Sequence, residues 1–309
     1  MARVRKLKVG YVILHYKNIK DTEKCIDSIL RTSVDGEILV VDNGSGDGTG
    51  EKLRDTYGRE HRCSFLLLDR NYGFSGGNNR GVQELRKQED IEFIVVTNND
   101  VVFYQNDFEN RIISIFGRTG FHVLGPDVYI PGNDEHQSPL FLTGISVDGL
   151  EKELDEYRYY RANPSEFIKR LKLHFIKNRL CSKSRVVNKL YAIIRKKDSI
   201  NYKCEYEDVG LQGSCIIFSK QFYSEVDKVF DPEPFLYCEE ALLYFRCKKD
   251  GYKMVYSPEI GIRHEEAASL KNSNKNEIDR MKFMLEHHVA ARELLLQYLK
   301  DNGFDTREQ

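Results

Sequence analysis

The stretch Asn71-Tyr72-Gly73-Phe74-Ser75-Gly76-Gly77-Asn78-Asn79-Arg80-Gly81 carries the strongest fold signal in this sequence. Three of its glycines fall within five residues, and glycine lets a backbone approach a bound group closely. Backbone amides that open a following helix form a ready site for an anion. The stretch therefore predicts a diphosphate-binding loop that leads into a helix through Val82 and Leu85. A flexible loop that only caps a helix is the structural alternative.

On both sides of this stretch, short apolar runs alternate with amphipathic ones, as in a mostly parallel sheet with crossover helices. We expect a helix with Asp21 as its N-cap after the first strand, and another that contains Ile112 and Phe116. Pro126 is expected to end a strand that begins at His122. The expected strands are residues 9–15, 37–41, 64–68, 93–97, 122–125, 213–218 and 254–256, with later helices at 239–249 and 277–299.

The composition is that of a soluble globular protein. Of 309 residues, 40% are hydrophobic and 31% are charged, and the net charge is −1. The seven cysteines are scattered without a C-x-x-C pair, which argues against zinc or redox chemistry and favours a reducing compartment. No apolar run approaches the roughly 20 residues of a membrane span. We therefore expect a cytoplasmic protein.

Two acidic residues end apolar runs. Asp42 follows residues 37–41, and the segment fails the G-x-G-x-x-G pattern because Thr49 occupies the final glycine position. A carboxylate at the carboxyl edge of a sheet can accept hydrogen bonds from a nucleotide, although Asp also forms turns for local reasons. Asp100 follows residues 94–96, where an acid can hold magnesium or manganese or simply begin a turn.

In this order the segments resemble the family 2 glycosyltransferases of the GT-A fold, especially the bacterial branch that includes rhamnosyltransferases and other cell-surface polysaccharide enzymes. The resemblance covers about residues 9–125 and 210–269. It rests on His15-Tyr16-Lys17-Asn18, Val41-Asp42-Asn43-Gly44-Ser45, the 71–81 stretch, Asn98-Asn99-Asp100, Gln212-Gly213-Ser214, Phe235-Leu236-Tyr237-Cys238-Glu239-Glu240, and residues 255–259 leading to His264.

The resemblance implies one GT-A domain over residues 1–309, with a Rossmann-like, mostly parallel sheet flanked by helices. Residues 1–130 would form the nucleotide-sugar-binding half, and residues 209–270 the acceptor and catalytic half. A basic helical insertion at 148–208 and a C-terminal helix at 277–301 complete the expected organisation.

The resemblance also implies roles for individual residues. Glu240 would be the catalytic base of an inverting transfer, with Glu239 as the reserve candidate, while Asp100 and His264 would hold a divalent cation, magnesium or manganese. The residues implied to contact the nucleotide-diphosphate sugar are His15, Asp42, Asn71, Gly73, Phe74, Asn78, Asn99 and Asp100.

Three departures from the family pattern matter. Asn98 and Asn99 replace the first two positions of its D-x-D motif, which leaves Asp100 as the only acid there. The base motif usually reads Glu-Asp-x-Asp-Leu, but here Leu242 replaces the third acid, which puts the acceptor contacts in question. The His287–His288 pair stands where many relatives have Arg-Asn, and we interpret it as a packing feature.

The expected activity is hexosyl transfer to a glycan or a polyprenyl-diphosphate-linked acceptor in cell-surface polysaccharide synthesis. A nucleotide-sugar-binding module without turnover is one alternative, supported by Leu242. A sugar-phosphate nucleotidyltransferase is another. It would need a glycine-rich loop after the first strand, and residues 15–18 contain no glycine.

The segment 166–203 contains twelve lysines and arginines against two acids. Ile168, Leu171 and Phe175 recur at helical spacing, so the segment can lie peripherally on the inner face of the cell membrane. A helical hairpin that packs on protein is the alternative. We do not expect nucleic-acid binding, because the rest of the chain is acidic and no nucleic-acid motif accompanies the patch.

Overall fold

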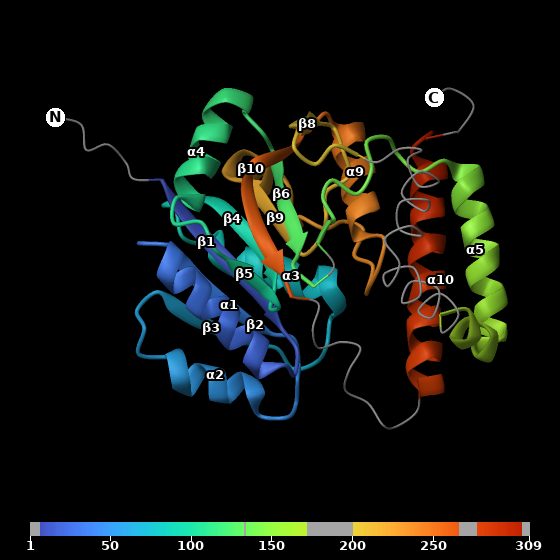
Figure 1. The fold of residues 1–309 in the computed structure, drawn as a ribbon, viewed down its shortest axis with the longest axis horizontal. Coiled ribbons are helices and arrows are strands. Elements are labelled where there is room, and N and C mark those ends of the chain that lie inside the picture. The colour runs from blue at the N-terminus through green and yellow to red at the C-terminus, as the bar shows by residue number, and fades with distance from the viewer. Residues whose placement is uncertain (1–6, 133, 172–199, 266–276, 305–309) are drawn as a thin grey trace, which may run out of the picture. The chain divides into compact units, whose positions relative to one another are not determined.

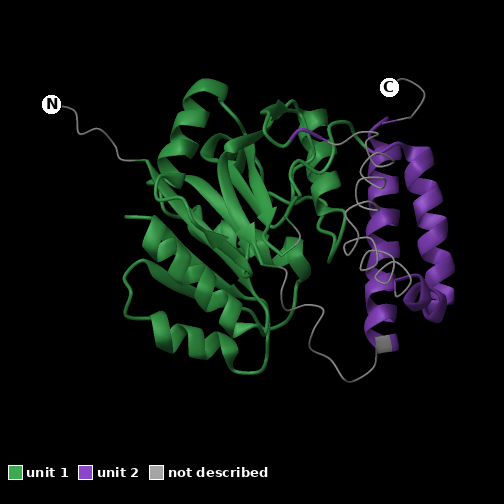
Figure 2. Ribbon diagram, viewed as in Figure 1, with its two compact units in different colours: residues 1–144, 202–271 green, residues 145–201, 272–309 purple. Residues whose placement is uncertain are grey.

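The computed structural model describes residues 7–132, 134–171, 200–265 and 277–304. The chain divides into two compact units (Figure 2). Unit 1 consists of residues 1–144 and 202–271, and unit 2 of residues 145–201 and 272–309.

Unit 1 is an α/β fold (Figure 1). Its described strands are β1 Lys8–His15, β2 Glu37–Asp42, β3 Cys63–Leu67, β4 Ile91–Asn98, β5 Val101–Phe103, β6 Val123–Ile130, β7 Glu135–His136, β8 Tyr206–Glu207, β9 Cys215–Ser219 and β10 Met254–His264. Its described helices are α1 Ile19–Thr32, α2 Thr49–Tyr57, α3 Gly73–Leu85, α4 Phe108–Thr119, α8 Lys220–Glu225 and α9 Glu239–Asp250.

The strands form one mixed sheet in the order β3-β2-β1-β4-β9-β6-β10-β5, with β7 beside β6 and β8 beside β10. The first four strands are parallel, since β1 pairs in parallel with β2 and β4, and β2 with β3. Strand β9 runs antiparallel between β4 and β6. The expected fold class is confirmed, and the parallel character is concentrated in the first third of the chain.

Both faces of the parallel half are covered, which explains why its strands read as continuous apolar runs. On one face, Tyr11 and Ile13 of β1 belong to a buried core with Ile26 of α1 and Ile112 of α4. On the other face, Val12 lies against α3.

The structure corrects three expectations about the elements. The N-cap of α1 is Asn18 instead of Asp21, because the Asn18 side chain accepts the Asp21 backbone N–H. The 71–81 stretch is not a loop: α3 begins at Gly73. Strand β6 runs through Pro126, whose missing N–H is tolerated because its partner β10 has a register irregularity between Ser257 and Gly261.

Unit 2 contains the antiparallel helices α5 (Val147–Ala162) and α10 (Glu277–Asp301), and residues 164–171 are also helical. Ion pairs join the two long helices, among them Arg158–Glu293 at 2.9 Å and Lys300–Glu151 at 2.7 Å. His288 packs 4.5 Å from the Tyr157 ring, and burial, with the nearby Arg292 charge, lowers its pKa to about 4. Helix α5, within the expected insertion, thus shares a unit with the C-terminal helix.

Most of the basic segment 166–203 lies outside the described residues. Within the described part of the chain, no helix is both long enough and apolar enough to cross a membrane.

Gly81 offers a test of how α3 packs on the sheet. A Cβ at this position would overlap Val12 and lie 2.9 Å from Val41 Cγ2, so Gly81→Ala should lower the free energy of unfolding by about 1–3 kcal/mol. Gly117 of α4 is exposed, and a Cβ there would meet no atom within 4 Å, so Gly117→Ala should stabilise by roughly 0.5–1 kcal/mol. Urea unfolding of both variants measures the contrast, and equal effects would contradict it.

Candidate active site

Three strands end side by side at the carboxyl edge of the sheet. His15 of β1 pairs with Asp42 of β2, and the preceding Leu14 pairs with Asn98 of β4. Open α/β sheets bind their ligands outside this edge. His15 and Asp42, both predicted to contact the sugar nucleotide, therefore lie side by side where a ligand is expected.

His15 and Asn99 are bonded to the protein itself. The buried His15 ring has Nδ1 2.7 Å from Thr22 Oγ1 and Nε2 2.9 Å from Thr49 Oγ1, and burial lowers its pKa. Asn99 Nδ2 donates to Thr22 Oγ1 at 2.9 Å. Both side chains were predicted to contact the nucleotide-diphosphate sugar. Their bonds indicate that they hold the starts of α1 and α2 in place.

The Asp42 carboxylate is buried and fixed in orientation. Its Oδ1 accepts hydrogen bonds from Ser45 N at 3.1 Å and Ser45 Oγ at 2.5 Å. Gly50 lies against Oδ2, where a side chain would overlap it. Asp42 is therefore held at the sheet edge by its own loop.

Asn43 ties the end of β2 to the start of α3, a role that the sequence did not reveal. Its Nδ2 donates to Asn71 Oδ1 at 3.0 Å and to Gly73 O at 2.9 Å, and its Oδ1 accepts Tyr72 N at 2.9 Å. The signal available in the sequence was the amide directly after Asp42. Asn71 is accordingly a loop-shaping residue whose Oδ1 also accepts Gly73 N at 2.7 Å.

The first turn of α3 is joined to the segment before α9. Gly73 has φ 73°, and a Cβ there would overlap Phe235 O, so only glycine fits. Phe74 N donates to Phe235 O at 2.7 Å, and the Phe74 ring packs edge-on against Phe230 at 5.4 Å. Asn79 adds bonds to the Phe230 backbone at 2.8 and 3.0 Å.

Several buried polar atoms around this junction have no hydrogen-bond partner among the described residues. They are Ser75 Oγ, both amide atoms of Asn78, Ser214 Oγ and Glu239 Oε2. Buried polar groups are almost always hydrogen-bonded in folded proteins. Their concentration here is what a site shaped for a polar ligand would leave in a structure without one.

Asp100 and His264 lie together, as a shared metal site requires. Asp100 Oδ1 is 3.2 Å from His264 Nε2, and the neighbouring Val101 of β5 pairs with His264 of β10. Within the described ranges, no group of three or more His, Cys, Asp or Glu side chains could hold a metal ion. The pair fits a magnesium or manganese ion that takes its remaining ligands from phosphate and water.

Glu239 and Glu240 open α9, after two residues in left-handed conformation, Tyr237 (φ 71°) and Cys238 (φ 61°). Such strain is concentrated at functional sites. Glu240 Oε1 accepts Gly213 N at 3.3 Å. Burial raises the pKa of both carboxyls, and the Glu240 charge raises the Glu239 pKa further. Leu242 is buried with the core of unit 1.

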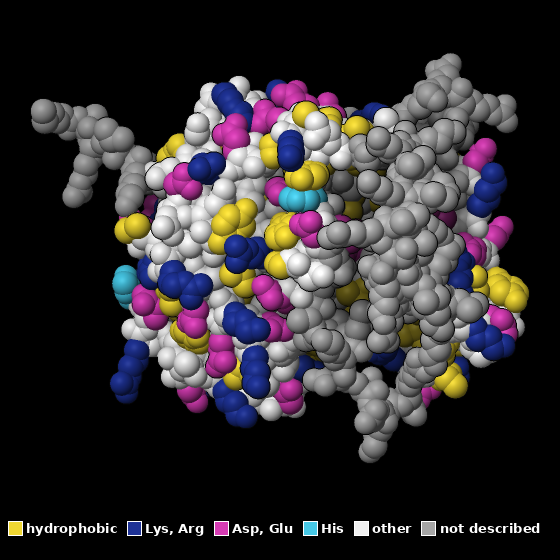
Figure 3. All heavy atoms as spheres, in the orientation of Figure 1, with side chains coloured by type: hydrophobic (Ala, Val, Ile, Leu, Met, Phe, Trp, Pro, Cys, Tyr) yellow, Lys and Arg dark blue, Asp and Glu magenta, His cyan; other side chains and the backbone are white. Residues whose placement is uncertain are grey.

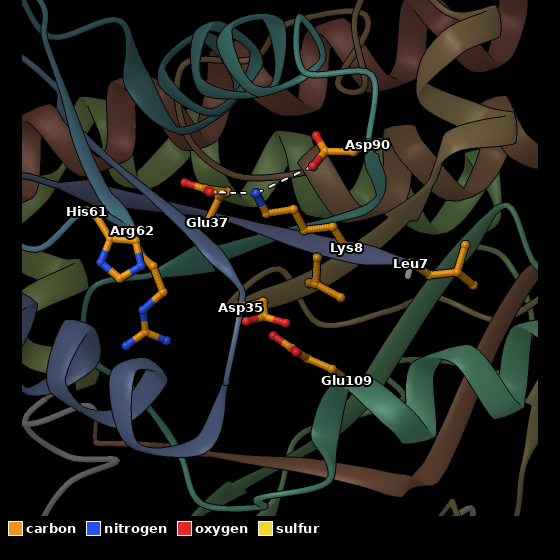
Figure 4. Close-up of a pocket in the computed structure, with 9 residues that line it drawn as sticks. Leu7, Lys8, Asp35, Glu37, His61, Arg62, Asp90 and Glu109 are labelled. Atoms are coloured by element: carbon orange, nitrogen blue, oxygen red, sulfur yellow. Dashed lines mark hydrogen bonds and ion pairs between the residues drawn. The ribbon is translucent and has the colours of Figure 1, made fainter. Parts of the chain in front are cut away.

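A cavity of about 340 Å³ lies at the opposite, amino-terminal edge of the sheet (Figure 4). Lys8 there contacts Glu37 at 2.6 Å and Asp90 at 3.5 Å, and Glu109 accepts the Tyr11 hydroxyl at 3.0 Å. Lys8, Glu37, Asp90 and Glu109 thus have protein partners, in contrast to the unsatisfied atoms around the start of α3.

The sequence profile of glycosyl transferase family 2 matches residues 11–185. The chain belongs to glycosyl transferase family 2. It is 22% identical over 279 residues to the uncharacterized protein y4gI of Sinorhizobium fredii, covering 86% of this chain and 26% of that protein. The chain thus spans about a quarter of the length of this curated relative.

Two solved structures share the fold of this family 2 member. TarS 1–349 of S. aureus has a TM-score of 0.51 and 12% identity, covering 96% of this chain and 72% of that one. GalNAc-T7, solved with UDP, GalNAc and Mn²⁺, has a TM-score of 0.56 and 12% identity, covering 84% and 44%. These similarities support the GT-A fold.

The raised pKa of Glu239 predicts a pH-dependent stability. The ordinary pKa of a glutamate is 4.5, and burial raises the pKa of Glu239 in the folded protein. The protonated carboxyl therefore contributes its full stabilisation below pH 4.5, and this stabilisation is lost as the pH rises through the folded pKa. Glu239→Gln cannot ionise, so it should be more stable than the wild type at pH 7.5 and equally stable near pH 4. Urea midpoints across this range measure the difference. Glu51→Gln, in the exposed first turn of α2, is the control, and a pH-independent gain in Glu239→Gln would contradict the assignment.

Proposed function

We propose that this family 2 member transfers a sugar, with inversion, from a nucleotide-diphosphate donor to a hydroxyl group of a glycan or lipid-linked acceptor. The observation that carries the proposal is the pair of glutamates with raised pKa at the start of α9. The pair is joined through Phe235 to the first turn of α3, where buried polar atoms of Ser75 and Asn78 lack protein partners among the described residues.

Glu240 acts as the base in this scheme. Its carboxylate takes the proton of the acceptor hydroxyl as the acceptor oxygen bonds to the anomeric carbon. The bond from that carbon to the diphosphate oxygen breaks on the opposite side, and its electron pair leaves with the nucleoside diphosphate. A carboxyl whose pKa is raised toward the working pH is a stronger base than an ordinary glutamate. Glu239 is the reserve candidate.

The donor lies along the carboxyl edge between β2 and α3. Asp42 accepts hydrogen bonds from the nucleoside, and the first turn of α3, with Ser75 and Asn78, faces the diphosphate. Asp100 and His264 would hold magnesium or manganese, which neutralises charge on the departing diphosphate when bound. The GalNAc-T7 structure, which contains UDP and Mn²⁺, supports this choice of ligands.

Three finer assignments rest on the resemblance of the sequence motifs to those of the family: a rhamnosyltransferase-like branch, a hexosyl donor and a role in cell-surface polysaccharide synthesis. A binding module without turnover is less well supported, because two carboxyls with raised pKa are retained at the base position. A nucleotidyltransferase is disfavoured by the lack of glycine in residues 15–18.

Peripheral membrane contact through residues 166–203 stays a prediction. In the described part of this segment, Lys169 pairs with Glu166 at 2.7 Å, and Arg170 pairs with Glu156. Exposed ion pairs of this kind are weak, so both cations remain able to face an anionic lipid surface. Sedimentation with anionic and neutral vesicles distinguishes membrane contact from packing on protein.

Removing the Asp100 charge should uncouple metal from donor binding. The wild type should be stabilised by a sugar nucleotide in the presence of manganese, by roughly 2.7 kcal/mol at 100 times Kd. Asp100→Asn should lose most of this gain and its turnover, because His264 alone supplies one ligand. A thermal-shift series with and without manganese measures both proteins, with Asp55→Asn on the exposed face of α2 as control. Full activity of the wild type in excess chelator would overturn the metal assignment.

Removing the basicity of Glu240 should stop chemistry and leave donor binding intact. Glu240→Gln should lower turnover by roughly 100- to 10,000-fold, the range for positioned acid–base groups, with an unchanged Kd for the donor. The wild-type rate should also fall as pH drops through the raised pKa, because only the carboxylate can take a proton. Initial rates between pH 5 and 9 test both points. If Glu239→Gln alone is inactive, the base is Glu239.

A further inference from the structure

A row of exposed and half-buried side chains crosses the part of the sheet next to the site. Arg263 of β10 pairs with Tyr129 of β6, and Tyr129 pairs with His136 of β7. Directly paired residues of neighbouring strands lie side by side on the same face. Tyr202 and Tyr104 extend this row at its two ends. We name the five residues the aromatic strip: Tyr104, Arg263, Tyr129, His136 and Tyr202.

The rings of the aromatic strip are in mutual contact. His136 stacks on Tyr202 with ring centres 3.5 Å apart and planes 8° apart, and Tyr129 lies 5.1 Å from His136. At the other end, the Arg263 guanidinium lies 5.1 Å above the Tyr104 ring, which is 45% exposed. Figure 3 shows hydrophobic, histidine and basic side chains side by side over β6 and β10.

Hydrogen bonds hold the strip rigid without a ligand. Asp127 accepts from His136 Nδ1 at 2.8 and 2.9 Å through both oxygens, and Asp134 accepts the Tyr129 hydroxyl at 3.0 Å. The Tyr202 carbonyl accepts the Tyr256 hydroxyl at 2.5 Å. Surfaces fixed in advance lose little conformational entropy when they bind, which favours recognition.

The strip is connected to the proposed base. Gln137, next to His136, accepts a hydrogen bond from Gln212 at 3.3 Å through its Oε1. Gln212 in turn accepts Ser214 N at 2.5 Å, and the intervening Gly213 donates to Glu240. These hydrogen bonds link the segment after β7 to the proposed base, and β6, β7 and β10 lie on the side of β9 away from β1 and β2.

We infer that the aromatic strip binds a sugar ring of the acceptor glycan. Aromatic faces carry negative potential and pack against the C–H groups on one side of a pyranose ring, while Arg263 and the nearby carboxylates can bond its hydroxyls. The acceptor hydroxyl must reach the base from the side opposite the donor, and the strip lies there. The inference rests on the proposed function, and it assigns the acceptor contacts that Leu242 cannot supply.

Two substitutions of Tyr202, one that removes the ring and one that keeps it, test whether the aromatic strip binds a sugar. Methyl glycosides and disaccharides of glucose, galactose, N-acetylglucosamine and rhamnose serve as probes. Their binding is measured by saturation-transfer NMR, and their KM by initial rates with the sugar nucleotide that the wild type turns over. Tyr202→Ala should weaken binding of the preferred probe and raise its KM on the order of tenfold, with an unchanged KM for the donor. Tyr202→Phe, which keeps the ring, should stay within about twofold of the wild type.

Exposed Tyr159 of α5, changed to Ala, controls for loss of a surface tyrosine, and thermal midpoints show that each variant is folded. The inference is overturned if none of the probes binds the wild type, or if Tyr202→Ala binds them as tightly as the wild type does. A wild type that binds the probes through Tyr202 but never consumes a sugar nucleotide contradicts the proposed function and leaves the strip as a carbohydrate site. The two failures are therefore distinguishable.

Discussion

The close approach of Gly73 to the Phe235 carbonyl is the contact on which the rest of the site depends. It requires a left-handed residue without a side chain, and it joins the start of α3 to the segment that leads into α9. Asn43 fixes the same turn to the end of β2 through three hydrogen bonds. The proposed diphosphate site and the proposed base, about 165 residues apart in sequence, thus share one anchor.

This arrangement is costly for stability. Two adjacent, half-buried glutamates have raised pKa values, two residues before α9 are left-handed, and polar atoms near α3 lack partners among the described residues. Each feature opposes folding, because desolvated charge and strained backbone are unfavourable. They persist because the parallel half of the sheet is covered on both faces by apolar side chains such as Tyr11, Ile13 and Val12. Such features are expected where binding and catalysis take precedence over stability.

The family resemblance implied that Asp100 and His264 share a site, and Asp100 Oδ1 lies 3.2 Å from His264 Nε2. Local patterns in the sequence were enough to predict the strands of the first half and the place of Asp42 at the end of one of them. Strand ends and turn residues carry this information directly. Three features were beyond such patterns. The helical state of the 71–81 stretch depends on Phe235 and Phe230, which are remote in sequence. Strand β6 continues through Pro126 because of an irregularity in β10. The supporting bonds of His15 depend on Thr22 and Thr49, which no motif includes.

In the proposed scheme, the two substrates lie on different halves of the sheet. Parallel strands need crossover helices, so the β1–β4 half is closed on both faces, and the proposed diphosphate site lies at its carboxyl edge, beside the start of α3. The β6–β10 half contains short antiparallel additions, β5, β7 and β8, which need no crossover helix. Next to these additions, Arg263 of β10, Tyr129 of β6 and His136 of β7 are directly paired and lie side by side on one face. A compact anion suits the first half, and a broad, uncharged sugar ring suits the second. Glu240 lies where the two halves meet, and it accepts a hydrogen bond from Gly213, just before β9, the strand that separates them.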